Sequence, residues 1–175
     1  WKNVNIWMVD ERFASIDSPD LNFTIAKNHF INELVESGKL PSENVFPFEF
    51  HTEQPDKGVG EYSAKFQENG TSYDIILLSS GEDGHVGSLF PFHPSVEDQS
   101  PFFITVNDAP KDPPDRISAS YNLISQSTVG LILFFGEGKR EAFNNFTNSS
   151  IDKNTCPAKV IEEMHEGYVY STIEK

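Results

Sequence analysis

The chain has 175 residues, of which 37% are hydrophobic and 13% aromatic, and its formal net charge is −14 at pH 7. This negative charge argues against nucleic-acid binding, because contacts to phosphate backbones need a basic surface. The apolar runs are far shorter than the roughly 20 residues of a membrane helix, and a single cysteine, Cys156, excludes an internal disulfide framework. We therefore expect one α/β domain over residues 1–175, in the cytoplasm, with no nucleic-acid or membrane partner.

Apolar segments typical of strands alternate along the chain with segments typical of helices. A first strand is expected over residues 4–10, and a helix over residues 20–37, where apolar positions recur at helical spacing. Further strands are expected over residues 44–50, 73–80, 101–107, 128–136 and 167–173, an extended or strand segment over 116–124, and helices over 56–68 and from about Glu137 and Pro157. The near-continuous apolar run 73–80 is typical of a strand buried on both faces of a parallel sheet. This alternation predicts a doubly wound, mostly parallel, Rossmann-type sheet flanked by helices.

Three polar clusters follow predicted strands. They are Asp10 to Arg12, Gly81 to His85, and Gly136 to Arg140. In doubly wound sheets, ligands bind beyond the carboxyl ends of the strands. The three clusters therefore predict one pocket formed by three loops.

The tripeptide Asp83-Gly84-His85 is the strongest candidate for catalysis. A neutral imidazole accepts a proton from water near neutral pH, and a neighbouring carboxylate fixes its tautomer and orientation. Gly84 allows the loop to turn back sharply, and Ser88 is expected to begin a short helix whose free N–H groups attract an anion. A glycine turn with a solvated histidine is the simpler interpretation of an isolated tripeptide, but the position after a buried strand favours catalysis.

Four cations can supply positive charge for an anionic substrate: Arg12, Lys111, Arg116 and Lys139. The planar guanidinium of Arg12 suits a phosphate, and the preceding Asp10 and Glu11 suit substrate hydroxyls. A surface ion pair explains these three residues equally well. For Arg116, which follows two prolines, simple exposure to solvent is the competing interpretation.

The sequence gives no indication of a metal or cofactor site. The other histidines, His29, His51, His93 and His165, lack the spacing of metal ligands. A Gly-X-Ser-X-Gly elbow, a dinucleotide fingerprint and a Walker loop are also missing from the sequence. We therefore expect neither a metal nor a cofactor.

Several segments, in chain order, resemble the 6-phosphogluconolactonase family. They are "VDER" after the first strand, "GEDGHVGSLFP", "APKDPPDRIS", and "GEGKREA" followed by "CPAKVI". The specific part is the block that runs from Asp83-Gly84-His85 to Ser88-Leu89-Phe90-Pro91. The related glucosamine-6-phosphate deaminases share the fold and a similar Asp-Gly-His, but usually continue differently and have Asp-Glu-Tyr where this chain has Asp10-Glu11-Arg12. Both differences favour the lactonase.

The resemblance implies hydrolysis of 6-phospho-D-glucono-1,5-lactone to 6-phosphogluconate, in the oxidative pentose phosphate pathway. It implies that His85 is the general base for the attacking water, and that Asp83 and Glu11 orient the base or the sugar hydroxyls. The substrate-binding residues that it implies are Asp10, Glu11, Arg12, Gly81, Gly84, Arg116 and Lys139. Among them, Arg12, Arg116 and Lys139 are expected to bind the phosphate or to stabilise charge.

Two features depart from the family's pattern. Family members carry an additional N-terminal segment with a Gly-Gly-Ser/Thr-rich loop that cradles the phosphate, and this sequence contains no such loop. We therefore expect the N-terminal part of the family's domain to be absent, which would expose a sheet edge and weaken phosphate binding. In addition, Ser79 stands where the family usually has glycine, and Val86-Gly87 replaces Thr-Ala.

Two other functions stay open on the sequence. One is deaminase or isomerase action on glucosamine 6-phosphate, and the other is a non-catalytic protein that binds sugar phosphates. Fusion to, or association with, glucose-6-phosphate dehydrogenase is also open, and the sequence does not determine the oligomeric state.

Overall fold

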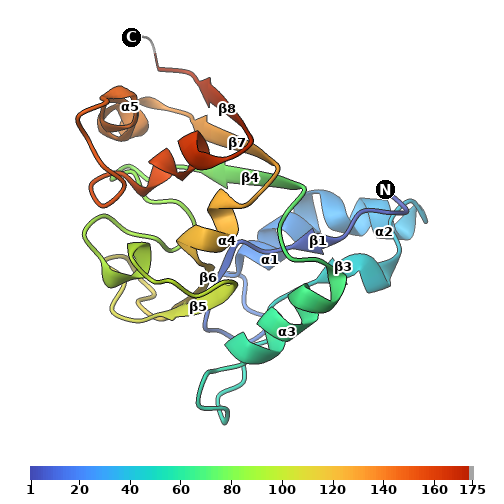
Figure 1. Ribbon diagram of the computed structural model, residues 1–175. Coiled ribbons are helices and arrows are strands. Elements are labelled where there is room, and N and C mark those ends of the chain that lie inside the picture. Colours follow the sequence, from blue (N-terminus) through green and yellow to red (C-terminus); the bar gives the residue numbers. More distant parts are fainter. Residues whose placement is uncertain (174–175) are drawn as a thin grey trace.

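A computed structural model describes residues 1–173 of the chain (Figure 1). Residues 174–175, the end of the predicted domain, lie outside the described residues. The strands are β1 (Ile6–Trp7), β2 (Asp10–Arg12), β3 (Val45–Phe46), β4 (Ile75–Ser79), β5 (Phe103–Val106), β6 (Arg116–Ala119), β7 (Val129–Phe134) and β8 (Glu166–Ser171). The α-helices are α1 (Asn22–Ala26), α2 (Asn32–Glu36), α3 (Val59–Asn69), α4 (Tyr121–Ser125) and α5 (Arg140–Thr147). A π-helical segment, Lys27–Ile31, joins α1 to α2, and short 3-10 segments cover Ser42–Asn44, Pro94–Val96, Glu137–Lys139 and Pro157–Glu163.

The strands form three small sheets, which corrects the prediction of one mostly parallel sheet. In β1-β3 and in β4-β7-β8 the strands are parallel, whereas β2-β6-β5 is antiparallel. The connection between β5 and β6 explains the difference. It spans residues 107–115, contains three prolines and no helix, and is too short for the helical crossover that parallel neighbours need. The α/β class is confirmed, and its sheets are mixed.

Several predicted elements differ in detail from those observed: the strand expected over 44–50 is only β3, and the helix expected from Pro157 is a 3-10 segment. The predicted strand 4–10 divides into β1, which pairs with β3, and β2, which pairs with β6. The extended segment 116–124 divides into β6 and α4, because the Ser120 side chain accepts a hydrogen bond from the Leu123 N–H and caps the helix. The predicted helix 20–37 is confirmed in position as α1, the π-helical segment and α2, and Gly38 follows it at φ +66°.

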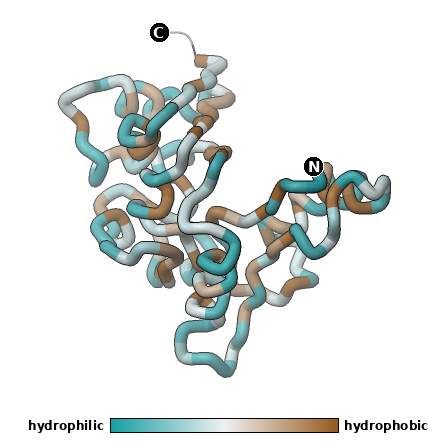
Figure 2. Tube along the Cα trace, turned by 45° about the vertical axis from the view of Figure 1, so that its right-hand side comes forward, coloured by the Kyte–Doolittle hydropathy of each residue, from teal (hydrophilic) through white to brown (hydrophobic). Residues whose placement is uncertain are grey.

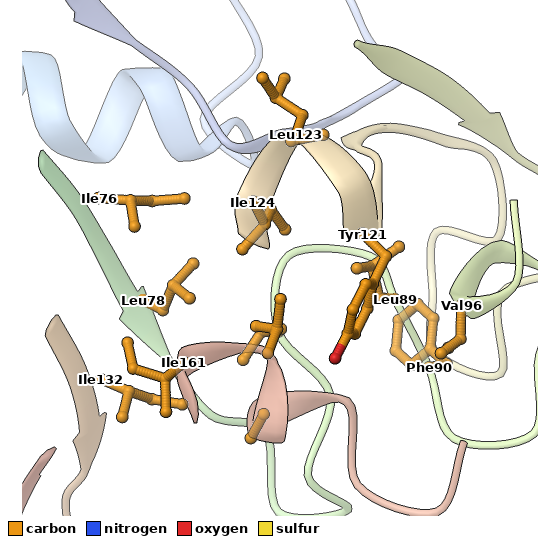
Figure 3. Close-up of a cluster of buried hydrophobic side chains, with 14 of the residues drawn as sticks. Ile76, Leu78, Leu89, Phe90, Val96, Tyr121, Leu123, Ile124, Ile132 and Ile161 are labelled. Atoms are coloured by element: carbon orange, nitrogen blue, oxygen red, sulfur yellow. The ribbon is translucent and has the colours of Figure 1, made fainter. Parts of the chain in front are cut away.

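The core lies between the sheets and the helices that cover them. Ile76 and Leu78 of β4 and Ile132 of β7 face Ile124 of α4 and Ile161 of the segment Pro157–Glu163 (Figure 3). A second small cluster lies under the N-terminal helix and contains Leu21, Phe23, Ile31 and Leu40. This N-terminal part, with β1, α1 and α2, projects from the rest of the molecule in both views (Figures 1 and 2).

The opposite face of the parallel sheet is uncovered, which corrects the prediction for residues 73–80. Burial alternates along β4, so that Ile75 is 66% exposed and Leu77 is 63% exposed. In register with them, Leu131 on β7 and Tyr168 on β8 continue the same face of the sheet. Apolar residues on both sides of β4 therefore do not mean burial on both sides here.

Among residues 1–173, no helix is both long enough and apolar enough to cross a membrane.

Candidate active site

The site is centred on the loop that leaves the carboxyl end of β4. The Nδ1 atom of His85 lies 2.6 Å from Oδ1 of Asp83, and the backbone N–H of His85 donates to the same carboxylate oxygen at 3.2 Å. The His85 side chain is 17% exposed, and its Nε2 atom makes no hydrogen bond to any of residues 1–173. A carboxylate on Nδ1 favours the tautomer with the proton on that nitrogen, which leaves Nε2 as a proton acceptor.

Two glycines of this loop are required by close packing. A methyl group on Gly81 would lie only 2.0 Å from Nδ1 of His85, so the imidazole rests directly on the backbone there. Gly84 has φ +91°, and a methyl group on it would lie 3.0 Å from Sγ of the buried Cys156. The loop is closed by the Gly81 N–H, which donates to the His85 carbonyl at 2.8 Å. Gly81 and Gly84 thus shape the loop that holds the histidine.

Charge around Asp83 keeps this carboxylate ionised. Partial burial by itself raises its pKa, but the hydrogen bonds and electrostatic interaction with His85 outweigh burial, and Lys111 adds to them. The pKa of Asp83 therefore lies well below its usual range. The Lys111 Nζ atom lies 3.6 Å from Oδ2, the carboxylate oxygen that does not contact His85.

A buried aromatic ring supports the other side of the histidine. The centroid of the Phe90 ring lies 4.6 Å from that of His85, and Phe90 is fully buried. The guanidinium of Arg116 lies over the same ring, 5.5 Å from its centroid. The sequence motif contained Phe90, but its contact with the imidazole was not predicted.

Asp10 contacts the histidine loop through a serine. The Ser88 hydroxyl donates to Oδ2 of Asp10 at 2.8 Å, and the Ser88 N–H donates to the Ser118 hydroxyl on β6 at 3.1 Å. Asn22 donates to Oδ1 of Asp10 at 3.1 Å. The short helix predicted from Ser88 is not formed, because this residue lies in a turn closed by the Leu89 N–H and the Val86 carbonyl. The first two predicted clusters nevertheless lie side by side.

Glu11 is fully buried and accepts hydrogen bonds from three backbone N–H groups. Its Oε1 accepts from Arg12 and Asn22, and its Oε2 accepts from Phe23 at 2.8 Å. Burial raises the pKa of Glu11, and the three N–H groups oppose this shift. These contacts favour a structural role for Glu11 at the start of α1, where free N–H groups need an acceptor. A contact between Glu11 and the substrate stays a prediction.

The two predicted arginines lie opposite each other on neighbouring strands, because Arg12 on β2 is in register with Arg116 on β6. Arg12 donates from Nη1 to the Asp20 carbonyl, while its buried Nε has no hydrogen-bond partner among residues 1–173. Arg116 is nearly buried and donates to three carbonyls of the proline-rich loop, those of Lys111, Asp112 and Pro113. Arg116 therefore holds the loop that carries Lys111.

The third cluster reaches the histidine loop through Glu82. A methyl group on Gly138 would lie 2.6 Å from Oε1 of Glu82, so the loop after β7 touches the loop after β4. Lys139 is partly exposed at the end of this cluster, and Arg140 forms an ion pair with Glu137 at 2.7 Å. The histidine loop thus contacts both other clusters, through Ser88 with Asp10 and through Glu82 with Gly138. The expected reason was wrong for the first cluster, because Asp10–Arg12 is itself strand β2 of the antiparallel sheet and does not follow a strand of the parallel sheet. Whether each of their side chains contacts a substrate stays a prediction.

No group of three or more His, Cys, Asp and Glu side chains with the arrangement of metal ligands occurs in residues 1–173. In the site, Asp83 pairs with His85 and Lys111, Glu11 accepts from backbone N–H groups, and Asp10 accepts from the Ser88 hydroxyl and the Asn22 amide.

Known proteins match this chain over most of its length. The sequence profile of the family described as glucosamine-6-phosphate isomerases/6-phosphogluconolactonase matches residues 1–170. A 6-phosphogluconolactonase of Borreliella burgdorferi is 25% identical over 175 residues, which cover 100% of this chain and 74% of that protein. The GDH/6PGL endoplasmic bifunctional protein of Homo sapiens is 30% identical over 148 residues, 81% of this chain but only 18% of that protein.

The fold is also similar to that of solved structures. The crystal structure of a 6-phosphogluconolactonase from Thermotoga maritima matches with a TM-score of 0.80 at 21% sequence identity, and covers 98% of this chain and 73% of that one. This likeness establishes the fold, and the profile match over nearly the whole chain establishes the family. The chain belongs to the 6-phosphogluconolactonase family, within the superfamily that also contains the glucosamine-6-phosphate isomerases.

Proposed function

We propose that this protein hydrolyses 6-phospho-D-glucono-1,5-lactone to 6-phosphogluconate, with His85 as the general base. The observation that carries the proposal is the His85–Asp83 pair, which lies at the end of a parallel strand and beside the arginine-bearing strands β2 and β6. Family membership supports the choice of substrate, since relatives that match the chain are 6-phosphogluconolactonases.

The chemistry needs only a base and an oriented water. Asp83 holds the proton on Nδ1 of His85, so that Nε2 accepts a proton from water as its oxygen attacks the lactone carbonyl. The tetrahedral intermediate collapses with cleavage of the bond between the carbonyl carbon and the ring oxygen. The proton on Nε2 then passes to the departing ring oxygen, which becomes a hydroxyl, and the imidazole returns to its neutral state.

The cations of the site divide into two groups in this proposal. Arg12 and Lys139 are the candidates for the phosphate, because both residues are partly exposed. Arg116 already donates to three carbonyls, so we assign its main effect to holding the loop of Lys111. Asp10, with two oxygens at the edge of the histidine loop, is the candidate for a sugar hydroxyl.

The test is lactone hydrolysis by wild type and by His85→Ala, corrected for the spontaneous rate in buffer. We expect His85→Ala to lower kcat/KM by about 10²- to 10⁴-fold, the usual contribution of a general base. His165→Ala is the matched control, because this histidine is 78% exposed and lies outside the site. A His85→Ala variant that hydrolyses the lactone as fast as wild type would contradict the mechanism.

The assay also separates the two alternative functions. Ammonia release from glucosamine 6-phosphate, without lactone hydrolysis above buffer, would identify a deaminase. Binding of 6-phosphogluconate without either reaction would identify a protein that only binds sugar phosphates.

A further inference from the structure

Phe92 combines two features that the packing of the chain does not explain. It follows the Ser88-Leu89-Phe90-Pro91 block, and its side chain is 78% exposed. Its backbone has φ +58°, in the left-handed region. Bulky residues rarely adopt this conformation, which is strained compared with an extended backbone. Both the strained backbone and the exposed aromatic ring of Phe92 are therefore unfavourable to the stability of the fold.

The surrounding chain fixes this strained conformation. The Phe92 N–H donates to the Asn154 carbonyl at 2.8 Å, and the next residue, His93, donates from its backbone to the Phe90 carbonyl at 3.1 Å. The His93 ring is itself held, by Ser95 and by the Asn107 carbonyl. The phenyl ring of Phe92 is thus presented to solvent by an ordered turn, and a glycine or asparagine would form that turn with less strain.

The ring lies beside Asp83 of the candidate catalytic pair. A depression open to solvent is lined by Asp83, Pro91, Phe92, Lys111, Glu141 and Asn145, among others. Asp83 is the carboxylate that orients His85, and Lys111 forms an ion pair with its second oxygen. The exposed ring and the groups that position the base therefore share one depression.

We propose that Phe92 is a substrate-contacting residue, whose ring packs against the C–H face of the sugar bound in the depression beside Asp83. A sugar ring presents C–H groups on its faces and hydroxyls around its rim. The depression offers a matching arrangement, because the phenyl ring is its exposed apolar surface, while Glu141 and Asn145 are hydrogen-bonding partners for hydroxyls. The identity of the sugar rests on the function proposed above.

The test exploits the strained backbone, because removal of the ring does not destabilise the turn. Phe92→Gly and Phe92→Asn both suit φ +58°, so we expect melting temperatures within about 3 °C of wild type. Phe92→Tyr keeps the ring. Lys57→Gly is the control for the backbone alone, since Lys57 has a similar φ of +60° in the loop before α3.

Two measurements are made on each variant: KM and kcat for the lactone, and the Kd of the product 6-phosphogluconate by calorimetry. For Phe92→Gly and Phe92→Asn we expect KM and Kd to rise about three- to tenfold, as for the loss of one aromatic contact, with kcat changed less than about twofold. Phe92→Tyr, which keeps the ring, should raise KM and Kd less than Phe92→Gly does, and Lys57→Gly should match wild type. Unchanged KM and Kd in Phe92→Gly would overturn the inference while lactone hydrolysis by wild type upheld the function.

The reverse outcome is also informative. If wild type bound 6-phosphogluconate without hydrolysing the lactone, and Phe92→Gly weakened that binding, the contact would stand and the proposed reaction would fall. If wild type neither bound the product nor hydrolysed the lactone, both proposals would be overturned.

Discussion

The antiparallel sheet and the parallel sheet of this protein differ in how they are covered. All four residues of β6, at the centre of the antiparallel sheet, are buried, and α3 packs on its neighbour β5 through Tyr62, Phe66 and Phe103. In the parallel sheet β4-β7-β8, one face packs on the core, whereas the opposite face exposes Ile75 and Leu77. The first sheet is enclosed, and the second is half covered.

The difference shows which part of the molecule fixes the site. The antiparallel sheet holds Glu11, Arg116 and Ser118 in buried hydrogen bonds, so these side chains have little freedom. The parallel sheet contributes the loops that follow β4 and β7. Only one face of this sheet packs on the core, so that face alone anchors the two loops. We infer that stability and site geometry depend on the enclosed sheet and on one face of the other, while the exposed face contributes mainly a tendency to associate.

The largest expected effect separates the two faces of β4. Leu78 is 3% exposed and Leu77 is 63% exposed, although they are neighbours in one strand. We expect Leu78→Ala to lower the free energy of unfolding by about 3 kcal/mol, because it leaves a cavity, and Leu77→Ala to lower it by less than about 1 kcal/mol. Urea unfolding of both variants checks this, and equal losses would show that the outer face is covered in solution.

The exposed face of β4 can also be tested through self-association of the protein. An uncovered apolar sheet face favours contacts between molecules, so wild type should show concentration-dependent association in sedimentation velocity. Leu77→Thr should reduce it, since threonine suits a strand and is polar. Association that Leu77→Thr left unchanged would assign the contact to another surface.

An intermediate effect is expected at Glu11, in the enclosed sheet. Glu11→Ala leaves three N–H groups, those of Arg12, Asn22 and Phe23, without an acceptor. We expect a loss of about 2 kcal/mol in the free energy of unfolding, because buried donors without partners are costly. Glu33→Ala, at an exposed position of α2, is the control and should change stability by less than about 0.5 kcal/mol. If the two variants lost the same amount, the cap would contribute nothing to stability.

Much of the element order could be predicted because it depends on local patterns. Apolar residues at helical spacing and a following glycine located the helix 20–37, and the apolar runs located β4 and β7 within a few residues. Strand pairing could not be predicted in this way. Residues 116–119 look like any short strand, and only their distant partners make the sheet antiparallel. The exposure of one face of β4 could not be predicted either, because Ile75 and Leu77 are as apolar as the buried residues beside them.

The candidate site divides in the same way. Asp83 and His85 are two residues apart, so their contact could be expected from the sequence. The ion pair of Lys111 with Asp83 joins residues 28 positions apart, and nothing in the local sequence indicates it. The left-handed backbone of Phe92 was also not predictable, since phenylalanine is among the residues least expected there.

The smallest expected effect concerns the contact between the two regions. Asp83 follows β4 of the parallel sheet, whereas Arg116 lies in the antiparallel sheet and Lys111 in the loop that Arg116 holds. The pKa of Asp83 lies below its ordinary value because His85 and Lys111 outweigh its partial burial. A carboxylate with a lowered pKa stabilises the folded state above its unfolded pKa of about 3.9, and loses this contribution as pH falls toward the folded value.

Asp83→Asn should therefore lower the free energy of unfolding by about 1 kcal/mol at pH 7, a modest value because solvent screens this partly exposed pair. The difference from wild type should stay constant down to about pH 5 and shrink below about pH 4, where the unfolded wild type takes up the proton. Urea unfolding of both proteins between pH 3 and pH 7 measures it. Asp17→Asn, at an exposed position before α1, is the control. A difference that grew as pH fell would mean that the carboxylate is destabilising when ionised, and the two regions would then repel rather than attract each other at this contact.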